Sequence, residues 1–182
     1  MRKGLIAGAV FACAALAGCS GGGATPEPST SAPEAPAPPS SSRTAPAKSL
    51  QVADQCGVLT PEQLQSLGVS IPPAPDETQG MAGCSFVSGA AGSDTGWNAF
   101  VTVTTKQTMQ QFSESHTTAQ QTTVGEYPAV NTQINNRNCT VAVDVSDQGS
   151  VIVNGLSRDP AVNGCDAMKK VAETVVPNLP NA

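Results

Sequence analysis

The sequence predicts an α+β domain in which helices pack on one face of an antiparallel β-sheet stapled by two disulfides. Three observations point to this fold. Segments of alternating, β-branched residues are joined mainly by turns, helical periodicity is confined to a few stretches, and four cysteines are spread over residues 56–165. We expect this domain at residues 50–182. It is preceded by an expected signal peptide at residues 1–18 and a lipidated, disordered tether at residues 19–49.

The first 18 residues have the pattern of a signal peptide. Arg2 and Lys3 supply a short positive region, and residues 4–18 follow without a charge. This apolar stretch is shorter than the about 20 residues that a transmembrane helix needs. It ends in residues 16–19 (LAGC), which resemble the lipobox of bacterial lipoproteins.

The lipobox resemblance implies that the thiol of Cys19 receives a diacylglyceryl group and that a signal peptidase cleaves before it. Two acyl chains give stable membrane attachment, at about 0.8 kcal/mol per buried CH₂. We therefore expect a lipid-anchored protein on the extracytoplasmic face of the cell membrane. Ordinary secretion with an incidental Cys19 is the alternative.

The expected tether is rich in proline and poor in apolar side chains. Residues 20–48 contain seven prolines and no Leu, Ile, Val, Met or aromatic residue. Apolar burial therefore cannot offset an ordering entropy of about 1–2 kcal/mol per residue. The composition predicts an extended spacer, whose Ser and Thr residues beside proline are candidate sites for O-linked sugars.

Helices are predicted at residues 60–67, 108–119 and 161–176. Thr60 and Gln63 form a capping box around Pro61, which suits the first helical position. In the last helix, apolar residues recur at helical spacing up to Pro177. They are Cys165, Met168, Val171, Ala172 and Val175.

Strands are predicted at residues 83–88, 98–105, 139–145 and 150–154. The last two form a hairpin around the turn at residues 146–149. Extended chain is expected around residues 122–132, interrupted by Pro128. Residues 71–80 (IPPAPDETQG) contain three prolines, so we expect a loop there.

The four cysteines of the domain are expected to form two disulfides, as in an exported protein. Of the three possible pairings, we expect Cys56–Cys84 and Cys139–Cys165, because each would tie a helix end to a strand. Loops of this size stabilise a domain by about 3–4 kcal/mol each. A zinc site is the rival interpretation, but the spacing contains no C-x-x-C pair. We expect no metal and no cofactor.

The charge of the chain excludes two classes of partner. The formal net charge is −5, and loss of Arg2 and Lys3 with the signal peptide leaves seven basic and fourteen acidic residues, or about −7. Phosphate backbones and anionic lipid surfaces both require basic residues. We expect no nucleic acid partner, and membrane contact through the N-terminal lipid alone.

Short motifs are spread over most of the expected domain. They are residues 56–62 (CGVLTPE) with Leu64, Leu67 and Gly68, then 84–86 (CSF), 125–130 (GEYPAV), 139–143 (CTVAV), 165–166 (CD) and 179–180 (LP). In this order they resemble domain of unknown function 3558, a family of actinobacterial lipoproteins. Phe86 stands where the family often has Trp. The resemblance implies a lipoprotein with disulfides, and it supplies no catalytic residues.

No group of residues in the sequence forms a convincing catalytic set. His116 is the only histidine, and it shares a helical stripe with Met109 and Phe112, so we expect it to border the core. Turn, helix-start or strand positions explain the candidate carboxylates, which are Asp144, Asp147, Asp159 and Asp166. We therefore expect no catalytic residue and no enzymatic activity.

Loops carry binding sites more often than cores do, and two loops are candidates here. They are residues 89–97 and 125–138, with Trp97 and Tyr127 as candidate binding residues. The sequence thus favours a non-enzymatic binding, sensor or accessory module of the cell envelope, with a small molecule, an envelope component or a protein as its partner. The alternatives are an envelope enzyme of unrecognised type and a structural wall-spacing protein.

Overall fold

The structure is a computed structural model of the chain, and it describes residues 42–90 and 92–182. The expected signal peptide, the lipidation candidate Cys19 and most of the expected tether lie outside the described residues. The expectations about them therefore stay predictions.

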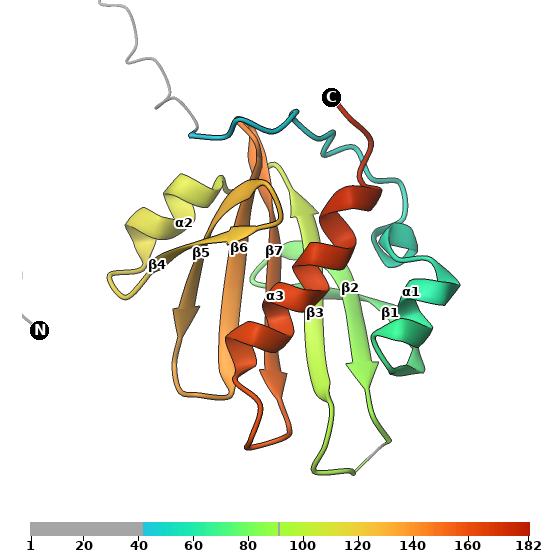
Figure 1. The fold of residues 1–182 in the computed structure, drawn as a ribbon. Coiled ribbons are helices and arrows are strands. Elements are labelled where there is room, and N and C mark those ends of the chain that lie inside the picture. The colour runs from blue at the N-terminus through green and yellow to red at the C-terminus, as the bar shows by residue number, and fades with distance from the viewer. Residues whose placement is uncertain (1–41, 91) are drawn as a thin grey trace, which may run out of the picture. The chain divides into compact units, whose positions relative to one another are not determined.

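The described residues form one antiparallel sheet of seven strands in the order β1-β2-β3-β7-β6-β5-β4 (Figure 1). Every pair of neighbouring strands is consecutive in sequence except β3 and β7, between which a helix and the strands β4, β5 and β6 lie along the chain. The strands are β1 Val69–Thr78, β2 Met81–Ser88, β3 Trp97–Thr104, β4 Gln120–Val124, β5 Tyr127–Gln133, β6 Asn138–Ser146 and β7 Gly149–Ser157.

Three α-helices accompany the sheet in the described part of the chain: α1 Pro61–Ser66, α2 Met109–Ser115 and α3 Gly164–Val175, with 3₁₀ turns η1 Gln55–Val58 and η2 Val176–Asn178. The predicted capping box of α1 is confirmed, because Thr60 and Gln63 each accept a hydrogen bond from the backbone of the other. Helix α2 ends at Ser115 rather than at residue 119. Its extended C-cap, His116, stops the helix there.

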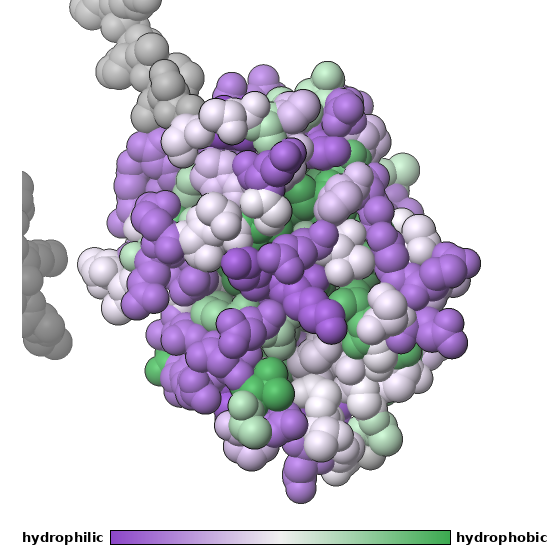
Figure 2. Space-filling view, viewed as in Figure 1, coloured by the Kyte–Doolittle hydropathy of each residue, from purple (hydrophilic) through white to green (hydrophobic). Residues whose placement is uncertain are grey.

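The main core lies between the sheet and α3, which crosses its face in front of β7 and β6 (Figure 1). Met168, Val171 and Val175 of α3 are fully buried against Val141, Val143 and other strand residues. Figure 2 shows the same side of the domain, where the outward surface is mainly hydrophilic with small apolar patches. Helix α3 thus has one buried face and one exposed face, as the periodicity of residues 164–175 predicts.

The expectation that all helices pack on one face of the sheet is wrong, because α2 packs on the opposite face from α3. Phe112 of α2 contacts a second, smaller core with Ala142 and Ile152. Side chains alternate between the two faces of a strand. Ala142 therefore points away from Val141 and Val143, which belong to the α3 core.

The expected loop at residues 71–80 is also wrong, since most of it belongs to β1. Pro72, Pro73 and Pro75 are tolerated because β1 is an edge strand and pairs only with β2. The β1–β2 register shifts between Val69 and Ala74, where two of the prolines lie. The prolines lack a backbone N–H, and they lie where the free edge and the register shifts require fewer strand-pairing hydrogen bonds.

Both expected disulfides are confirmed. Cys56–Cys84 joins η1 to β2, and Cys139–Cys165 joins β6 to α3, each with a Cα–Cα distance of 5.0 Å. Both bonds therefore fasten an element of the α3 side to the sheet.

The folded part begins before Leu50, where we expected it to start. Residues 43–48, called the strap below, cross the end of the sheet: Lys48 N donates to Val145 O, and Tyr127 Oη donates to Pro46 O, both at 2.8 Å. Ala182 N donates to Ala47 O at 2.9 Å. The lack of large apolar residues in the strap predicts that it belongs to the tether, but these tertiary hydrogen bonds hold it against the domain.

Candidate functional site

The sheet face that carries α2 is only partly covered. Helix α2 has seven residues and spans about 10 Å, whereas β6 and β7 have nine residues each and span about 30 Å. One end of this face is crossed by the strap, and α2 covers its middle. The other end, where β6 begins and β7 ends, is left open.

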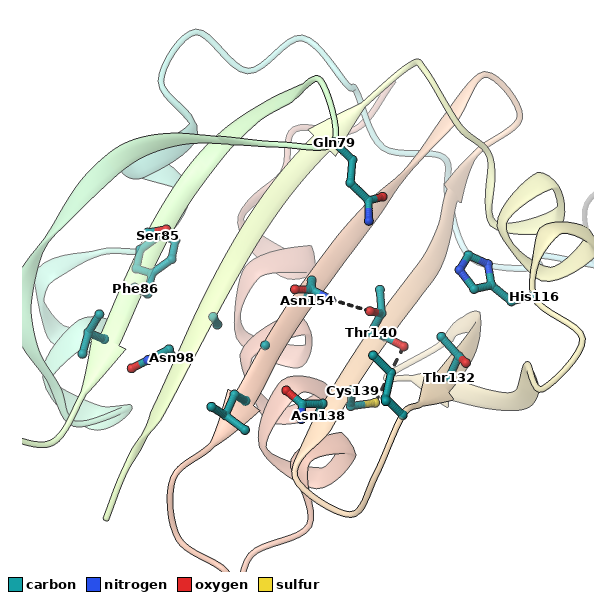
Figure 3. Close-up of a pocket in the computed structure, with 15 residues that line it drawn as sticks. Gln79, Ser85, Phe86, Asn98, His116, Thr132, Asn138, Cys139, Thr140 and Asn154 are labelled. Carbon is teal, nitrogen blue, oxygen red and sulfur yellow. Dashed lines mark hydrogen bonds between the residues drawn. The ribbon is translucent and has the colours of Figure 1, made fainter. Parts of the chain in front are cut away.

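A cavity of about 580 Å³ occupies this open end (Figure 3), and a second of about 260 Å³ adjoins it at α2. The two cavities share Gln79, His116, Thr140 and Asn154, and together they are called the groove. The larger cavity is also lined by Ser85, Phe86, Val87, Asn98, Ala99, Thr132, Ile134, Asn138, Cys139, Gly155 and Leu156. The smaller one lies against α2 and reaches Met81, Phe100, Gln107, Phe112, Ser115 and Ile152.

Strand register arranges the floor of the groove into two rows that run across the sheet. In the near row, which is next to α2, each residue pairs with the next: Ser85, Phe100, Asn154, Thr140, Thr132. In the far row the order is Val87, Asn98, Leu156, Asn138. Neighbouring strands are about 4.8 Å apart, so the rows place amide, hydroxyl and apolar side chains at that interval.

The groove lining contains no Asp, Glu, Lys or Arg residue among the residues that the structure describes. One lining residue, Ser85, is bonded to a carboxylate outside the groove. Its Oγ donates to Asp76 at 2.6 Å, and Glu77 N donates to the same carboxylate at 2.7 Å. These two hydrogen bonds lower the pKa of Asp76 below its ordinary 3.8, and the bond from Ser85 has the larger effect. The lining itself offers uncharged donors and acceptors.

Asn154 and Thr140 form the polar centre of the groove. Asn154 Nδ2 donates to Thr140 Oγ1 at 2.6 Å, the bond drawn in Figure 3. An amide has two donor hydrogens and one carbonyl oxygen, and a hydroxyl has one donor hydrogen. This bond therefore leaves Asn154 Oδ1 and the Thr140 hydroxyl hydrogen for other partners.

Gln79 has a backbone conformation that glutamine rarely adopts. It forms the β1–β2 turn with Gly80, and the two residues have φ values of 53° and 73°. Such two-residue turns favour Asn, Asp or Gly, and an L-residue in this region is destabilised by about 1–2 kcal/mol. The Gln79 side chain points from the turn toward Asn154 (Figure 3). Strain at a residue that reaches into a cavity is a feature of functional sites.

His116 lies at the α2 side of the groove, where its ring stacks on Phe112 with centroids 4.2 Å apart. Its Nδ1 lies 2.8 Å from Phe112 O, which only accepts, so Nδ1 carries a hydrogen and donates it. In the neutral ring, Nε2 is then an acceptor. The expectation that His116 borders the core is confirmed, and it also borders the groove.

The residues singled out from the sequence for binding lie elsewhere. Trp97 is half-buried against the α3 core, and Tyr127 is buried in that core with its hydroxyl bonded to the strap. Of the two candidate loops, residues 125–138 contribute Thr132, Ile134 and Asn138 to the groove. Residues 89–97 contribute no lining residue among those described.

Two further site types are absent from the described residues. No group of three His, Cys, Asp or Glu side chains in this part of the chain is placed to hold a metal ion. None of its helices combines the length and the apolar character needed to cross a bilayer.

A family model described as "Protein of unknown function (DUF3558)" matches residues 14–178. The chain belongs to this family. No curated protein and no solved structure matches it. Most of the DUF3558 motif residues recognised in the sequence are core or disulfide positions: Cys84, Phe86, Tyr127 and Cys139 belong to the α3 core, and Cys56 and Cys165 are disulfide partners. Two motif residues, Ser85 and Thr140, point to the other face and line the groove. The motifs that mark DUF3558 in this chain therefore specify mainly its fold.

Sequence reasoning missed the groove residues of this DUF3558 chain for a simple reason. Asn98, Thr140 and Asn154 occupy outward positions of strands, where a polar side chain is also expected if the face is solvated. One sequence signal was usable, since Gln79-Gly80 is a two-residue turn between two strands. The prolines of β1 argued against the first of those strands, so the turn was not recognised.

Proposed function

We propose that this protein is a lipid-anchored, extracytoplasmic module of the cell envelope that binds a ligand in the groove without transforming it. The lipobox-like residues 16–19 support the anchor, and two disulfides suit an oxidising compartment. The groove carries the binding role. Its larger cavity, of about 580 Å³, lies at the open end of the sheet face, and its polar side chains include the bonded pair Asn154 and Thr140.

The lining favours binding over catalysis. Catalysis by acid, base or nucleophile needs a group matched to its task and a second group that orients it. Among the described groove residues, His116 is the only histidine, and its Nδ1 hydrogen is used to bond Phe112 O. Amides and hydroxyls that point into a cavity recognise a ligand by hydrogen bonds.

An enzyme remains the second candidate, because Ser115 Oγ lies 3.0 Å from His116 Nδ1. Ser115 Oγ also donates to Phe112 O at 2.8 Å, so both side chains share the carbonyl that ends α2. This arrangement suits a helix terminus better than a nucleophile and its base. Loss of a hydrolytic activity in Ser115→Ala, with ligand binding retained, would establish the enzyme instead.

The anchor is tested in cells by comparing the natural chain with Cys19→Ser. We expect the natural chain in the membrane fraction, with a mature N-terminal mass that includes a diacylglyceryl cysteine, and the variant in the soluble fraction or unprocessed. A mature protein that keeps an unmodified Cys19, or lacks it, contradicts the anchor.

Binding is tested on the purified chain by a survey of neutral, acidic and basic small molecules, oligosaccharides and peptides. A ligand of the folded state raises the unfolding temperature, by an amount that grows with the logarithm of the ratio of its free concentration to its Kd. Asn154→Leu with Thr140→Val removes the polar centre at nearly constant shape and should abolish the shift. Asn131→Leu places the same change on the α3 face of β5 and should keep it. A survey with no shift, or shifts that survive the double substitution, contradicts the proposal.

A further inference from the structure

The groove has three features that narrow the chemistry of its ligand. Its lining is uncharged, its hydrogen-bonding groups are amides and hydroxyls, and it lies in the middle of the sheet. The first and third features each exclude a class of ligand, and the second indicates which class remains. The inference rests on the proposed binding role of the groove.

The absence of charge from the described lining excludes ligands whose recognition depends on charge. A phosphate, carboxylate or ammonium group that enters a cavity loses hydration, which only an opposite charge or several strong hydrogen bonds replace. The groove offers neither Lys or Arg for an anion nor Asp or Glu for a cation. Its ligand is therefore neutral at the contact surface.

The central position in the sheet excludes recognition of a peptide by added strand pairing. That mode needs the free backbone groups of a sheet edge. The floor strands β2, β3, β7 and β6 each have a hydrogen-bonded strand on both sides. Only side chains are available in the groove.

The remaining groups match vicinal hydroxyls. An amide donates and accepts at neighbouring atoms, as a pair of sugar hydroxyls does. In the far row such groups alternate with apolar residues, among them Leu156, and in the near row Phe100 lies between Ser85 and Asn154, at the inter-strand interval of about 4.8 Å. That interval is comparable to one pyranose ring, whose C–H faces are apolar and whose hydroxyls are polar.

Two further residues fit an extended ligand at the groove rim. Gln79 holds a strained backbone conformation and directs its amide toward Asn154 (Figure 3). Ile134 is 92% exposed, although it is a large apolar residue, and it lines the same cavity. We propose that the groove binds a neutral saccharide chain, with Asn154, Thr140 and Gln79 contacting its hydroxyls and Ile134 contacting a ring face.

The test uses the purified, isotope-labelled chain with maltohexaose, cellohexaose and mannohexaose as neutral probes. Hexagalacturonic acid and glucosamine hexamer are the charged counterparts. We expect at least one neutral probe to shift the side-chain amide resonances of Asn98, Asn154 and Gln79 in a saturable way. Substitution Asn154→Ala should weaken binding about tenfold, as expected for one lost hydrogen-bonding group.

Gln79→Gly separates binding from folding. Glycine relieves the positive φ, so this variant should unfold at a higher temperature than the natural chain and still bind the probe more weakly. Gln148→Gly, in the β6–β7 turn away from the groove, is the matched control and should leave affinity unchanged. Equal affinity of Gln79→Gly and the natural chain contradicts the role of Gln79 and with it the proposed contact set.

Failure of this inference is distinguishable from failure of the proposed function. If a charged hexamer or another ligand of the survey occupies the groove and the neutral probes do not, up to about 10 mM, the saccharide class is wrong and the binding role stands. If neutral probes shift resonances only outside the groove, the inference is overturned as well. If no ligand of any class perturbs the groove residues, both are overturned.

Discussion

Arg43 Nη1 lies 2.6 Å from Asp144 Oδ1, although the two residues are 101 positions apart and both side chains are more than nine-tenths buried. Arg43 Nη2 also donates to Asp147 Oδ1 at 2.9 Å. The guanidinium thus fastens the strap to the β6–β7 hairpin.

We predict that Arg43→Ala lowers the free energy of unfolding by about 3 kcal/mol, because it leaves the Asp144 carboxylate buried without the guanidinium. Urea denaturation measures the change. The control is Lys169→Ala, whose ion pair with Glu173 is 3.8 Å long and exposed, and which should change stability by less than about 0.5 kcal/mol. Equal effects of the two substitutions would show that the ion pairs of Arg43 contribute no more to stability than an exposed pair.

The two disulfides should contribute almost equally. Their sequence separations are 28 and 26 residues, for which loop closure gives about 3.5 kcal/mol each. We expect double substitution of either pair by Ala to lower the unfolding free energy by that amount, and proteolytic mapping of the natural protein to recover the linkages Cys56–Cys84 and Cys139–Cys165. A crossed linkage in the map would refute the described pairing.

Gly155 allows close packing of β7 against α3. A Cβ at this position would overlap Met168 Sδ and the backbone oxygen of Asn98. We predict that Gly155→Ala lowers the unfolding free energy by about 3 kcal/mol, since backbone atoms cannot yield as a flexible side chain does. Gly57→Ala is the matched control: its Cβ would lie 3.1 Å from the Asp54 side chain, which has room to move, and we expect a change below about 1 kcal/mol.

Tyr127 should make stability fall at alkaline pH. Burial of the phenol raises its pKa above 10.0, with Glu126 adding to this and Arg43 opposing it. Because the folded state holds the proton more tightly, its stabilising effect is fully present below the unfolded pKa of about 10 and is lost as pH rises through the folded pKa. Tyr127→Phe removes this dependence.

At neutral pH, Tyr127→Phe should be about 1 kcal/mol less stable than the natural chain, because it loses the hydrogen bond to Pro46 O. The difference should shrink as pH rises above about 10. Unfolding measured at pH 7 and pH 11 checks both statements, and a constant difference would mean that the phenol ionises equally in both states.

The Ser85–Asp76 hydrogen bond predicts an acid titration beside the groove. The pKa of Asp76 lies below 3.8 because Ser85 Oγ and Glu77 N donate to the carboxylate, so this stabilising contribution is present above 3.8 and is lost as pH falls through the lowered value. We expect Ser85→Ala to raise the pKa of Asp76, as followed by carboxyl carbon NMR. The control is Thr78→Ala. Thr78 lies in β1, as Asp76 does, but makes no hydrogen bond to Asp76, so this substitution should leave the pKa of Asp76 unchanged.

Local patterns were sufficient for most of the elements. The capping box at Thr60 and Gln63, the alternation in β3, β6 and β7 and the helical periodicity of α3 all depend on residues close in sequence. Their physical causes are local hydrogen bonds and side-chain periodicity, so sequence reasoning recovered them. Edge strand β1 was missed because proline tolerance depends on which side of the strand is unpaired.

The sequence by itself determined the family, the sheet-and-helix class and the two disulfides, because the cysteines and apolar residues that specify them form one core. Only the tertiary structure decided which face of the sheet α2 covers and how much of that face it leaves open. It also decided where the strap crosses the sheet and which outward polar residues share the groove. The reason is register: Ser85, Asn154 and Thr140 come from different strands, and only the pairing of those strands brings their side chains into one row.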